Sequence, residues 1–299
     1  MLWKTSRFEI DLSQPRVMGI VNLTPDSFSD GGQLTDPHIA MRHCERLIQD
    51  GADILDLGAE SSRPGARPIS AEEEIGRLLP VVRHALSLGV PISVDTYKPE
   101  VMQVCLDLGV DIVNDIWALR WASEDAAALT AMDVIAGHPH CGVCLMHMHR
   151  SPQDMQKHPM ADPVWPQVMD FLQSRAHELV AKGVQRGRIV LDPGVGFGKT
   201  VSQNMQLLAD QLQLNGLGFG VLIGWSRKST LAALIDEGRA TTACHSLAKH
   251  RLAASIAAAI MAIDRGAHVL RVHDVRETVD AIRVWQAVQS HAKGNVVAQ

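Results

Sequence analysis

The stretch LDPGVGFGKT, residues 191–200, has the composition of a phosphate-binding loop: a glycine-rich turn after an apolar run, ending in Gly-Lys-Thr. Such loops bind phosphate oxygens through backbone N–H groups that small residues leave accessible. The spacing does not fit, because G-x-x-x-x-G-K-[ST] needs its first glycine where Pro193 stands, and proline has no N–H. The dinucleotide pattern G-x-G-x-x-G fails too, since Gly198 comes one place early. This loop therefore needs another explanation than nucleotide binding.

Polar residues stand at the end of each apolar run along the chain. They are Asn22, Asp56, Asp95, Asn114, Asp115, His147, Asp192, Arg271 and His273, with Lys228 just beyond its run. Among them, Asp95, Asn114 and Asp192 offer hydrogen-bond acceptors at the end of apolar strands. A carboxylate accepts two parallel N–H bonds from an amino-pyrimidine edge, so these residues suit a flat heterocycle.

The second kind of group is cationic or can become so: Arg63, Lys228, Arg271 and His273. Arg271 and His273 lie two residues apart on one predicted strand, so both side chains point the same way, just before a predicted helix N-terminus. Helix N-termini favour anions. The sequence thus indicates a site with a neutral heterocycle at one end and an anion at the other.

Each of these residues also has a structural interpretation. Asp95 or Asp115 could cap the following helix, and Lys228 could be a solvated residue at a helix start. His147 and His149 could be a metal pair, but a third ligand is missing nearby, and we favour a structural role. We favour the functional interpretation because these polar residues stand at the end of every predicted strand. Helix capping alone does not place chemically complementary side chains at every strand end.

The elements that must position these residues alternate strictly. Apolar runs at 17–22, 53–58, 91–95, 111–115, 142–148, 189–194, 220–224 and 268–274 read as strands covered on both faces. The segments between them read as helices at about 37–50, 71–88, 98–108, 123–135, 162–183, 201–213, 228–236 with 244–265, and 275–291. Ser70 is expected to cap the second helix, and Asp274 with Glu277 has capping-box spacing.

This alternation predicts a (β/α)8 TIM barrel in a single domain over residues 1–299, with an N-terminal hairpin at 1–15 that closes the barrel floor and the barrel at 16–292. A doubly wound open sheet is the alternative. We prefer the barrel because the polar strand ends would converge on its C-terminal mouth, whereas an open sheet would string them along one edge. The loops at 22–32 and 60–68 are rich in Ser, Gly and Pro, as mobile lids over a barrel mouth often are.

Composition narrows the class further. The formal charge of −5 and the lack of a long basic run argue against nucleic-acid binding. The N-terminus has no continuous apolar region of a signal peptide, and the longest apolar run, 252–263, is too short to span a membrane. Five cysteines, an odd number, suggest reduced thiols in a cytoplasmic protein, and we expect Cys141 and Cys144 to be buried and inert.

The consecutive segments GIVNLTPDSFSDGG, ADILDLGAESSRPGA, ISVDTYKPEV, DIVNDI, CLMHM, LDPGVGFGKT, IGWSRKS and LRVHDV resemble, in order, the motifs of the dihydropteroate synthases over roughly residues 17–276. The resemblance implies that 6-hydroxymethyl-7,8-dihydropterin pyrophosphate is joined to p-aminobenzoate, releasing pyrophosphate. It also implies a Mg2+ cofactor and a homodimer, in whose interface the Ala-rich helix around 252–263 could pack.

The resemblance assigns roles residue by residue. Catalytic roles would fall to Asp95, Lys228, Arg63 and Asp192; the pterin would contact Asp95, Asn114, Ile116, Met146, Asp192, Lys228 and Gly224. The diphosphate would contact Asn22, Arg63, Arg271 and His273, and Asn22 would also ligate Mg2+. The p-aminobenzoate would contact Ser62, Arg63, Pro64, Phe197, Lys228 and Ser229, with Thr24, Asp26 and Phe28 on the first lid.

The implied chemistry needs no side-chain nucleophile, which agrees with the absence of a Ser-His-Asp or Cys-His pattern. One departure is Ser62, where the family commonly has threonine; the hydroxyl is kept and a methyl is lost, so sulfonamide sensitivity could change. Two rivals are a pterin-binding barrel that transfers methyl groups to a corrinoid protein and a catalytically silent paralogue. The first would lack SRKS and the diphosphate groups; the second would first lose Asn22, Arg63, Lys228 or His273, all of which are present.

Overall fold

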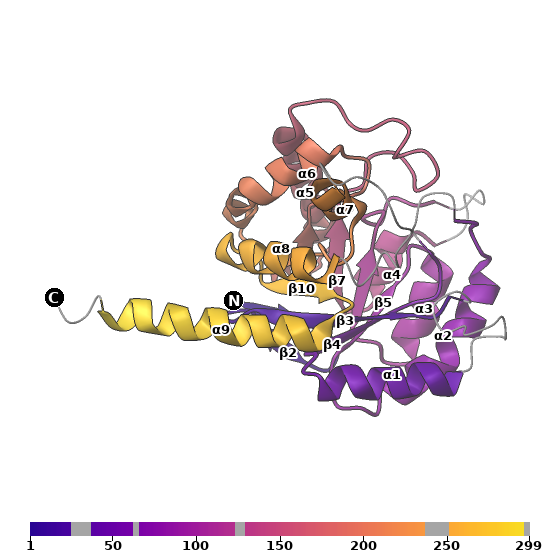
Figure 1. Cartoon of the computed structure of the whole chain (residues 1–299). Coiled ribbons are helices and arrows are strands. Elements are labelled where there is room, and N and C mark those ends of the chain that lie inside the picture. The colour runs from indigo at the N-terminus through magenta and orange to yellow at the C-terminus, as the bar shows by residue number, and fades with distance from the viewer. Residues whose placement is uncertain (25–36, 62–65, 123–128, 237–250, 296–299) are drawn as a thin grey trace.

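Parallel strands form a closed barrel at the centre of the molecule (Figure 1). The structure is a computed structural model and describes residues 1–24, 37–61, 66–122, 129–236 and 251–295. Within these residues the barrel strands are β3 (Arg16–Asn22), β4 (Ile54–Gly58), β5 (Ile92–Asp95), β6 (Ile112–Asp115), β7 (Gly142–Met146), β8 (Ile189–Asp192), β9 (Gly220–Ile223) and β10 (Val269–Val272). Each pairs with the next, and β10 closes on β3. The predicted (β/α)8 barrel is confirmed, and the open sheet is excluded.

Helices connect the strands on the outside of this barrel. They are α1 (Pro37–Gln49), α2 (Ala71–Ala85), α3 (Pro99–Asp107), α4 (Ala131–Gly137), α5 (Val164–Ala181), α6 (Val201–Ala209), α7 (Ser229–Asp236), α8 (Leu252–Asp264) and α9 (Val275–Asn295), with short 3-10 turns η1 (Arg186–Arg188) and η2 (Gln211–Leu217). The strands are almost entirely buried because barrel residues cover one face and helices the other. The continuous apolar runs of the sequence have this cause.

Capping residues set several helix boundaries. The expected cap of α2 is confirmed, since Ser70 Oγ accepts the backbone N–H of Glu73 at 3.1 Å. The helix predicted at 123–135 begins only at Ala131, because Thr130 Oγ1 caps it by accepting the Asp133 N–H at 3.1 Å; residues 123–128 lie outside the described part. The helix predicted at 201–213 ends at Ala209 and continues as the tighter turn η2.

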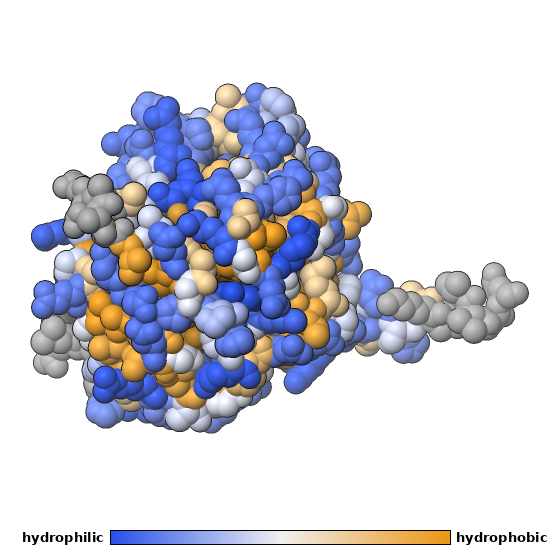
Figure 2. All heavy atoms as spheres, turned by 180° about the vertical axis from the view of Figure 1, so that it is seen from behind, coloured by the Kyte–Doolittle hydropathy of each residue, from blue (hydrophilic) through white to orange (hydrophobic). Residues whose placement is uncertain are grey.

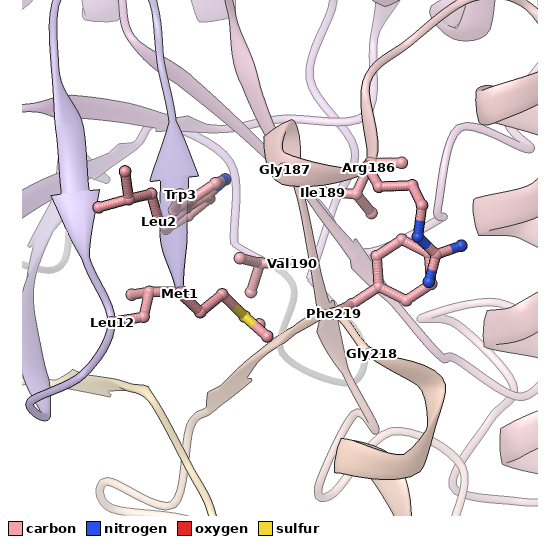
Figure 3. A pocket seen from close by; sticks show the side chains of 11 residues that line it. Met1, Leu2, Trp3, Leu12, Arg186, Gly187, Ile189, Val190, Gly218 and Phe219 are labelled. Atoms are coloured by element: carbon pink, nitrogen blue, oxygen red, sulfur yellow. The ribbon is translucent and has the colours of Figure 1, made fainter.

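The N-terminal hairpin closes the barrel floor, as predicted. Its strands β1 (Leu2–Lys4) and β2 (Glu9–Asp11) are antiparallel, and Trp3 is fully buried among apolar residues from the barrel strands, including Met18 and Leu222. A pocket of about 280 Å³ opens beside the hairpin. Figure 3 shows Met1 and Leu12 on one side of it and Val190 and Phe219 on the other. It is formed at the floor, away from the strand ends that carry the predicted site.

The last two helices differ in exposure from the others. Helices α8 and α9 pack against each other, and α9 projects beyond the body of the molecule (Figure 1). On the face opposite to that view, hydrophilic residues interleave with apolar patches, and α9 again extends past the surface (Figure 2). Val284 and Val288 on α9 are 68% and 61% exposed. Among the described residues, no helix combines the length and apolarity needed to cross a membrane.

Candidate active site

The strand register aligns predicted site residues in one row at the C-terminal mouth of the barrel. Asn22 on β3 pairs with Gly58 on β4, Gly58 pairs with Asp95 on β5, and Asp95 pairs with Asn114 on β6. On the other side of the mouth, Met146 pairs with Asp192 across β7 and β8. Residues far apart in the sequence thus end at the same level, which the convergence argument required.

A buried charge network joins the two ends of this row. Arg271 on β10 donates from Nε to Asp56 Oδ2 and from an η-nitrogen to Asp95 Oδ2, both at 2.6 Å. Asn114 Nδ2 donates to the same Asp56 oxygen at 3.2 Å. Asp56 is completely buried, and its Oδ1 has no hydrogen-bond partner among the described residues. Asp56 had been noted only as a polar strand end; the structure makes it the residue that orients Arg271 and Asn114.

This network changes the proton affinity of its members. Burial raises the pKa of Asp95 to about 7; Arg271 opposes the shift, and the carboxylates of Asp56, Glu74 and Asp115 add to it. Burial would lower the pKa of Arg271, but Asp56 and Asp95 outweigh it and raise that pKa. The guanidinium therefore stays charged, whereas Asp95 can change its protonation near neutral pH.

Asp192, Phe197 and Lys228 form the opposite wall. Asp192 Oδ1 accepts the Gly194 N–H at 2.7 Å, and burial raises the pKa of this carboxyl. Lys228 Nζ lies 4.3 Å from the centre of the Phe197 ring, a cation–π distance. Burial lowers the pKa of Lys228 to about 8, although Asp192 partly restores it.

Apolar side chains line the space between these groups. Ile116 and Met146 are 7% and 4% exposed and form one cluster with Met148 and Met155, against which Phe197 packs. A cluster of flat and flexible apolar groups beside carboxylates suits an aromatic heterocycle. Gly224 follows β9 next to Arg271: a Cβ there would lie 3.9 Å from the Arg271 carbonyl oxygen.

The loop from Asp192 to Thr200 owes its glycines to close backbone contacts. Gly194, Gly196 and Gly198 all have positive φ, at +68°, +81° and +73°. A Cβ on Gly194 would lie 1.8 Å from the His147 carbonyl oxygen, and one on Gly198 would lie 2.7 Å from His149 Cβ. Any larger residue would push this loop off the end of β7. The glycines thus fit the loop against its neighbour, which explains them without a nucleotide.

Lys199, the lysine of the Gly-Lys-Thr triplet, turns inward rather than toward a ligand. Its Nζ contacts His147 Nδ1 and the Gly194 carbonyl, both at 2.9 Å, and the Phe197 carbonyl at 3.2 Å. Burial lowers the pKa of Lys199 to about 7. Burial also lowers the pKa of His147 to about 2, and the neighbouring charge of Lys199 adds to this shift. His147 is therefore a neutral, buried packing residue, as we favoured.

The structure shows which roles several aspartates and two cysteines have in the fold. Asp115 accepts the backbone N–H groups of Trp117 and Leu119, both at 2.7 Å, so it shapes the turn after β6. Asp95 bonds to Arg271 instead of capping α3. The expected capping box at Asp274 is replaced by an ion pair, because Arg227 occupies its carboxylate at 2.5 Å. In the described residues, Cys141 and Cys144 are buried free thiols, as expected.

The anion end of the predicted site lies around the loop after β9. His273 Nδ1 is 3.0 Å from Ser226 Oγ, and the His273 N–H donates to the same hydroxyl at 3.2 Å. Arg227 has the left-handed φ of 59°, a strained backbone of the kind found at functional sites, directly before Lys228. Ser229 follows as the exposed first residue of α7.

Some predicted residues cannot be placed. Ser62, Arg63 and Pro64, together with Asp26 and Phe28, lie outside the described residues; Thr24 stands just after β3.

Sequence reasoning also missed a buried cluster of Glu60, Glu74, Tyr97 and Lys98. The one local signal was Lys98 in VDTYKPEV, three residues after Asp95 and directly before the proline that starts α3.

Comparison with known proteins decides the family. A profile for pterin binding enzymes matches residues 18–273. Dihydropteroate synthase of Neisseria meningitidis serogroup B is 43% identical over 292 residues, covering 96% of this chain and 97% of the relative. The chain belongs to the dihydropteroate synthase family of pterin-binding enzymes.

Solved structures of the family agree. Xanthomonas albilineans dihydropteroate synthase with 4-aminobenzoic acid has 44% identity and a TM-score of 0.82, covering 94% of this chain and 95% of that one. Burkholderia cenocepacia dihydropteroate synthase complexed with 7,8-dihydropteroate has 40% identity and a TM-score of 0.83, covering 98% of both chains. The chain is thus a transferase of folate biosynthesis, and the comparisons favour this family over the methyl-transferring rival.

Proposed function

We propose that the chain condenses 6-hydroxymethyl-7,8-dihydropterin pyrophosphate with p-aminobenzoate to give 7,8-dihydropteroate and pyrophosphate. The observation that carries this proposal is the mouth of the barrel, where acceptors for a heterocycle, an apolar lining and cationic groups meet. The family relationship supports the identity of both substrates, because relatives are known with 4-aminobenzoic acid and with 7,8-dihydropteroate.

The pterin would bind through its amino-pyrimidine edge. Asp192 is fixed by the Gly194 N–H and Asn114 by Asp56, so both are oriented before substrate arrives. Ile116 and Met146 would cover the ring faces. Prepositioned acceptors in a buried pocket bind a flat donor edge strongly, since no reorganisation is needed when the ligand arrives.

The reaction follows as a dissociative substitution. The methylene carbon–oxygen bond breaks, and the electron pair leaves with the diphosphate. Positive charge then develops on the pterin methylene, where the Asp95 carboxylate stabilises it. The amine nitrogen of p-aminobenzoate forms the new carbon–nitrogen bond and releases a proton. Lys228, stacked on Phe197, would border this second substrate, with Ser62, Arg63, Pro64 and Ser229 as further contacts.

The leaving diphosphate would meet Arg271 and His273, with Arg63 from the second loop. The Ser226 hydroxyl holds the His273 ring in one orientation. Arg271 is anchored by Asp56 and Asp95, so its charge links the diphosphate end to the pterin end. Fixed positive charge stabilises a leaving group because it is already in place as negative charge develops.

The residues fit Mg2+ as a companion of the diphosphate. Asn22 ends β3 in the same register row as Asp95 and offers one amide oxygen. Among the described residues no three His, Cys, Asp or Glu side chains gather as a metal site, and Mg2+ usually combines few protein oxygens with substrate phosphates. We propose that Asn22 holds the ion, which would neutralise charge on the leaving diphosphate.

We further propose a cytoplasmic homodimer. Met261 on α8 is 48% exposed, and α9, which packs against α8, exposes Val284 and Val288. A Val284→Glu/Val288→Glu variant should be monomeric by light scattering while the parent is dimeric. A dimer that persists in this variant would exclude α9 from the interface.

The four described cysteines are all unpaired, which supports a reducing compartment.

The decisive assay combines purified protein, the pterin pyrophosphate, p-aminobenzoate and Mg2+, and follows pyrophosphate and dihydropteroate. Both products should appear only when both substrates are present, and ATP alone should give none. If the pterin binds but neither product forms, the silent-paralogue alternative replaces this proposal.

A further inference from the structure

Lys98 is a buried lysine whose ammonium contacts two carboxylates. The residue is 5% exposed; its Nζ lies 2.5 Å from Glu74 Oε2 and also contacts Glu60 Oε2. Tyr97 completes the cluster by donating from its hydroxyl to Glu60 Oε1 at 2.8 Å. The Tyr97 ring lies 4.8 Å from the same ammonium. None of these four residues has a role in the proposed chemistry.

The two carboxylates stand at opposite ends of one loop. Glu60 comes two residues after β4, and Glu74 lies in the first turn of α2. The segment between them contains Ser62, Arg63 and Pro64, the residues expected at p-aminobenzoate and diphosphate. Lys98 itself stands at the N-cap of α3, three residues after Asp95. One ammonium therefore connects both ends of this loop to the strand that carries Asp95.

The cluster also borders the mouth. One pocket is lined by Glu60, Glu74 and Tyr97 of this cluster and by Asp95 and Ile116. Asp95 and Ile116 belong to the proposed pterin site, so the clamp formed by Glu60, Glu74, Tyr97 and Lys98 shares one cavity with that site. A shift of Glu60 or Glu74 would change the side of this cavity formed by the loop after β4 and leave the side formed by Asp95 and Ile116 in place.

The charges make the clamp sensitive to Lys98. Burial raises the pKa of Glu74, and the Lys98 hydrogen bond and charge oppose that shift. Without Lys98, two buried carboxylates would face each other with no counter-ion. Burying such charges unpaired is costly, so one would take up a proton or the loop ends would separate. Either response alters the loop rather than the strand residues that hold the pterin.

We propose that Lys98 is a positioning residue: it ties both ends of the loop after β4 to β5 and thereby sets the affinity for p-aminobenzoate. The inference rests on the proposed function and deepens it. Lys98 touches no substrate in this scheme and acts only through Glu60 and Glu74.

The test compares Lys98→Met, Lys98→Arg and Tyr97→Phe with the parent. Lys98→Met should raise KM for p-aminobenzoate at least 10-fold and change the dissociation constant of 6-hydroxymethyl-7,8-dihydropterin, which lacks the diphosphate that Arg63 would contact, less than 3-fold. Lys98→Arg keeps a cation and should recover most of the affinity. Tyr97→Phe removes one bond to Glu60 and should raise the same KM about 3-fold. The matched control is Lys182→Met, which breaks the exposed 2.7 Å pair with Asp133 and should change neither constant.

Two outcomes overturn the proposal. One is an unchanged KM for p-aminobenzoate in folded Lys98→Met; the other is an equal loss of affinity for p-aminobenzoate and for the pterin without diphosphate, with no rescue by arginine, which indicates a general structural role. If Lys98→Met does not fold, the KM of Tyr97→Phe decides. An inactive parent refutes the proposed function alone, because amide hydrogen exchange of residues 59–75 still tests the clamp. It should be faster in Lys98→Met or Tyr97→Phe than in the parent and normal in Lys98→Arg; equal exchange refutes it.

Discussion

The floor and the mouth of the barrel both bury charged side chains, but they treat them differently. At the floor, Asp111 accepts from Arg7 N at 3.0 Å, from the Arg7 guanidinium at 2.6 Å and from the Ile92 N–H at 2.9 Å. Arg188 donates to the carbonyls of Cys141 and His138 at 2.6 and 2.8 Å. These groups tie the hairpin and η1 to the barrel, and the protein itself supplies their partners.

At the mouth, the partners are incomplete. Asp56 Oδ1 has none among the described residues, and partial burial moves the pKa values of Asp95 and Lys228 toward neutrality, to about 7 and about 8. Unsatisfied charge costs folding free energy, and such groups persist where a ligand completes them. The floor therefore serves stability and the mouth serves binding, the division expected of a TIM barrel.

The largest expected effect on stability comes from Asp111→Ala at the floor, which tests whether the floor serves stability rather than binding. It removes the acceptor of Arg7 and of two backbone N–H groups, so we expect the free energy of unfolding to fall by about 3 kcal/mol. The specific activity of the folded enzyme should stay within about 3-fold of the parent, since no substrate contact changes. Denaturant unfolding and initial rates check this. Asp280→Asn, in an exposed pair with Arg283, is the control and should leave Tm unchanged.

The reciprocal change at the mouth is Lys228→Met. The ammonium over Phe197 is lost together with its proposed contacts to the pterin and to p-aminobenzoate, and we expect kcat/KM to fall about 100-fold because both substrates lose a positioning group. Because burial already disfavours the charged form, Tm should be equal or higher. Steady-state kinetics and thermal melts measure both. A large drop in Tm with normal kinetics would reverse the assignment of floor and mouth.

A third prediction concerns pH. The Asp95 pKa is raised above its unfolded value, so the folded state binds the extra proton between the ordinary carboxyl pKa and about 7. Stability from this group is present at low pH and is lost as pH rises through about 7. The Tm of the parent should therefore decline more across pH 5–8 than the Tm of Asp95→Asn. Parallel Tm curves would show that Asp95 is not perturbed.

The smallest effect is expected from Ser62→Thr. Restoring one methyl beside the p-aminobenzoate site is worth about 0.8 kcal/mol, or about 4-fold in a sulfonamide inhibition constant. Tm should not change, because the substitution adds a single methyl group to a residue expected to contact p-aminobenzoate. Inhibition assays of both proteins decide the point, and equal constants would remove any role for Ser62 in drug sensitivity.

The sequence by itself determined the barrel and the position, at its mouth, of most residues of the predicted heterocycle site. Apolar runs and helical segments have local periods, and a parallel strand ends where its run ends, so Asp95, Asn114 and Asp192 could be assigned to one mouth. Pro193 excluded the nucleotide loop in the same local way. Helix starts were less certain, because a single cap such as Thr130 moves them by several residues.

Only the tertiary structure decided which charges meet. Arg271 bonds to Asp56 across 215 residues, and Lys98 bonds to Glu60 and Glu74 across the β4–α2 loop. Lys199, the lysine of the Gly-Lys-Thr triplet, folds back onto loop carbonyls. Such pairings depend on barrel closure and on side-chain direction in a buried space, and no local pattern along the chain contains either.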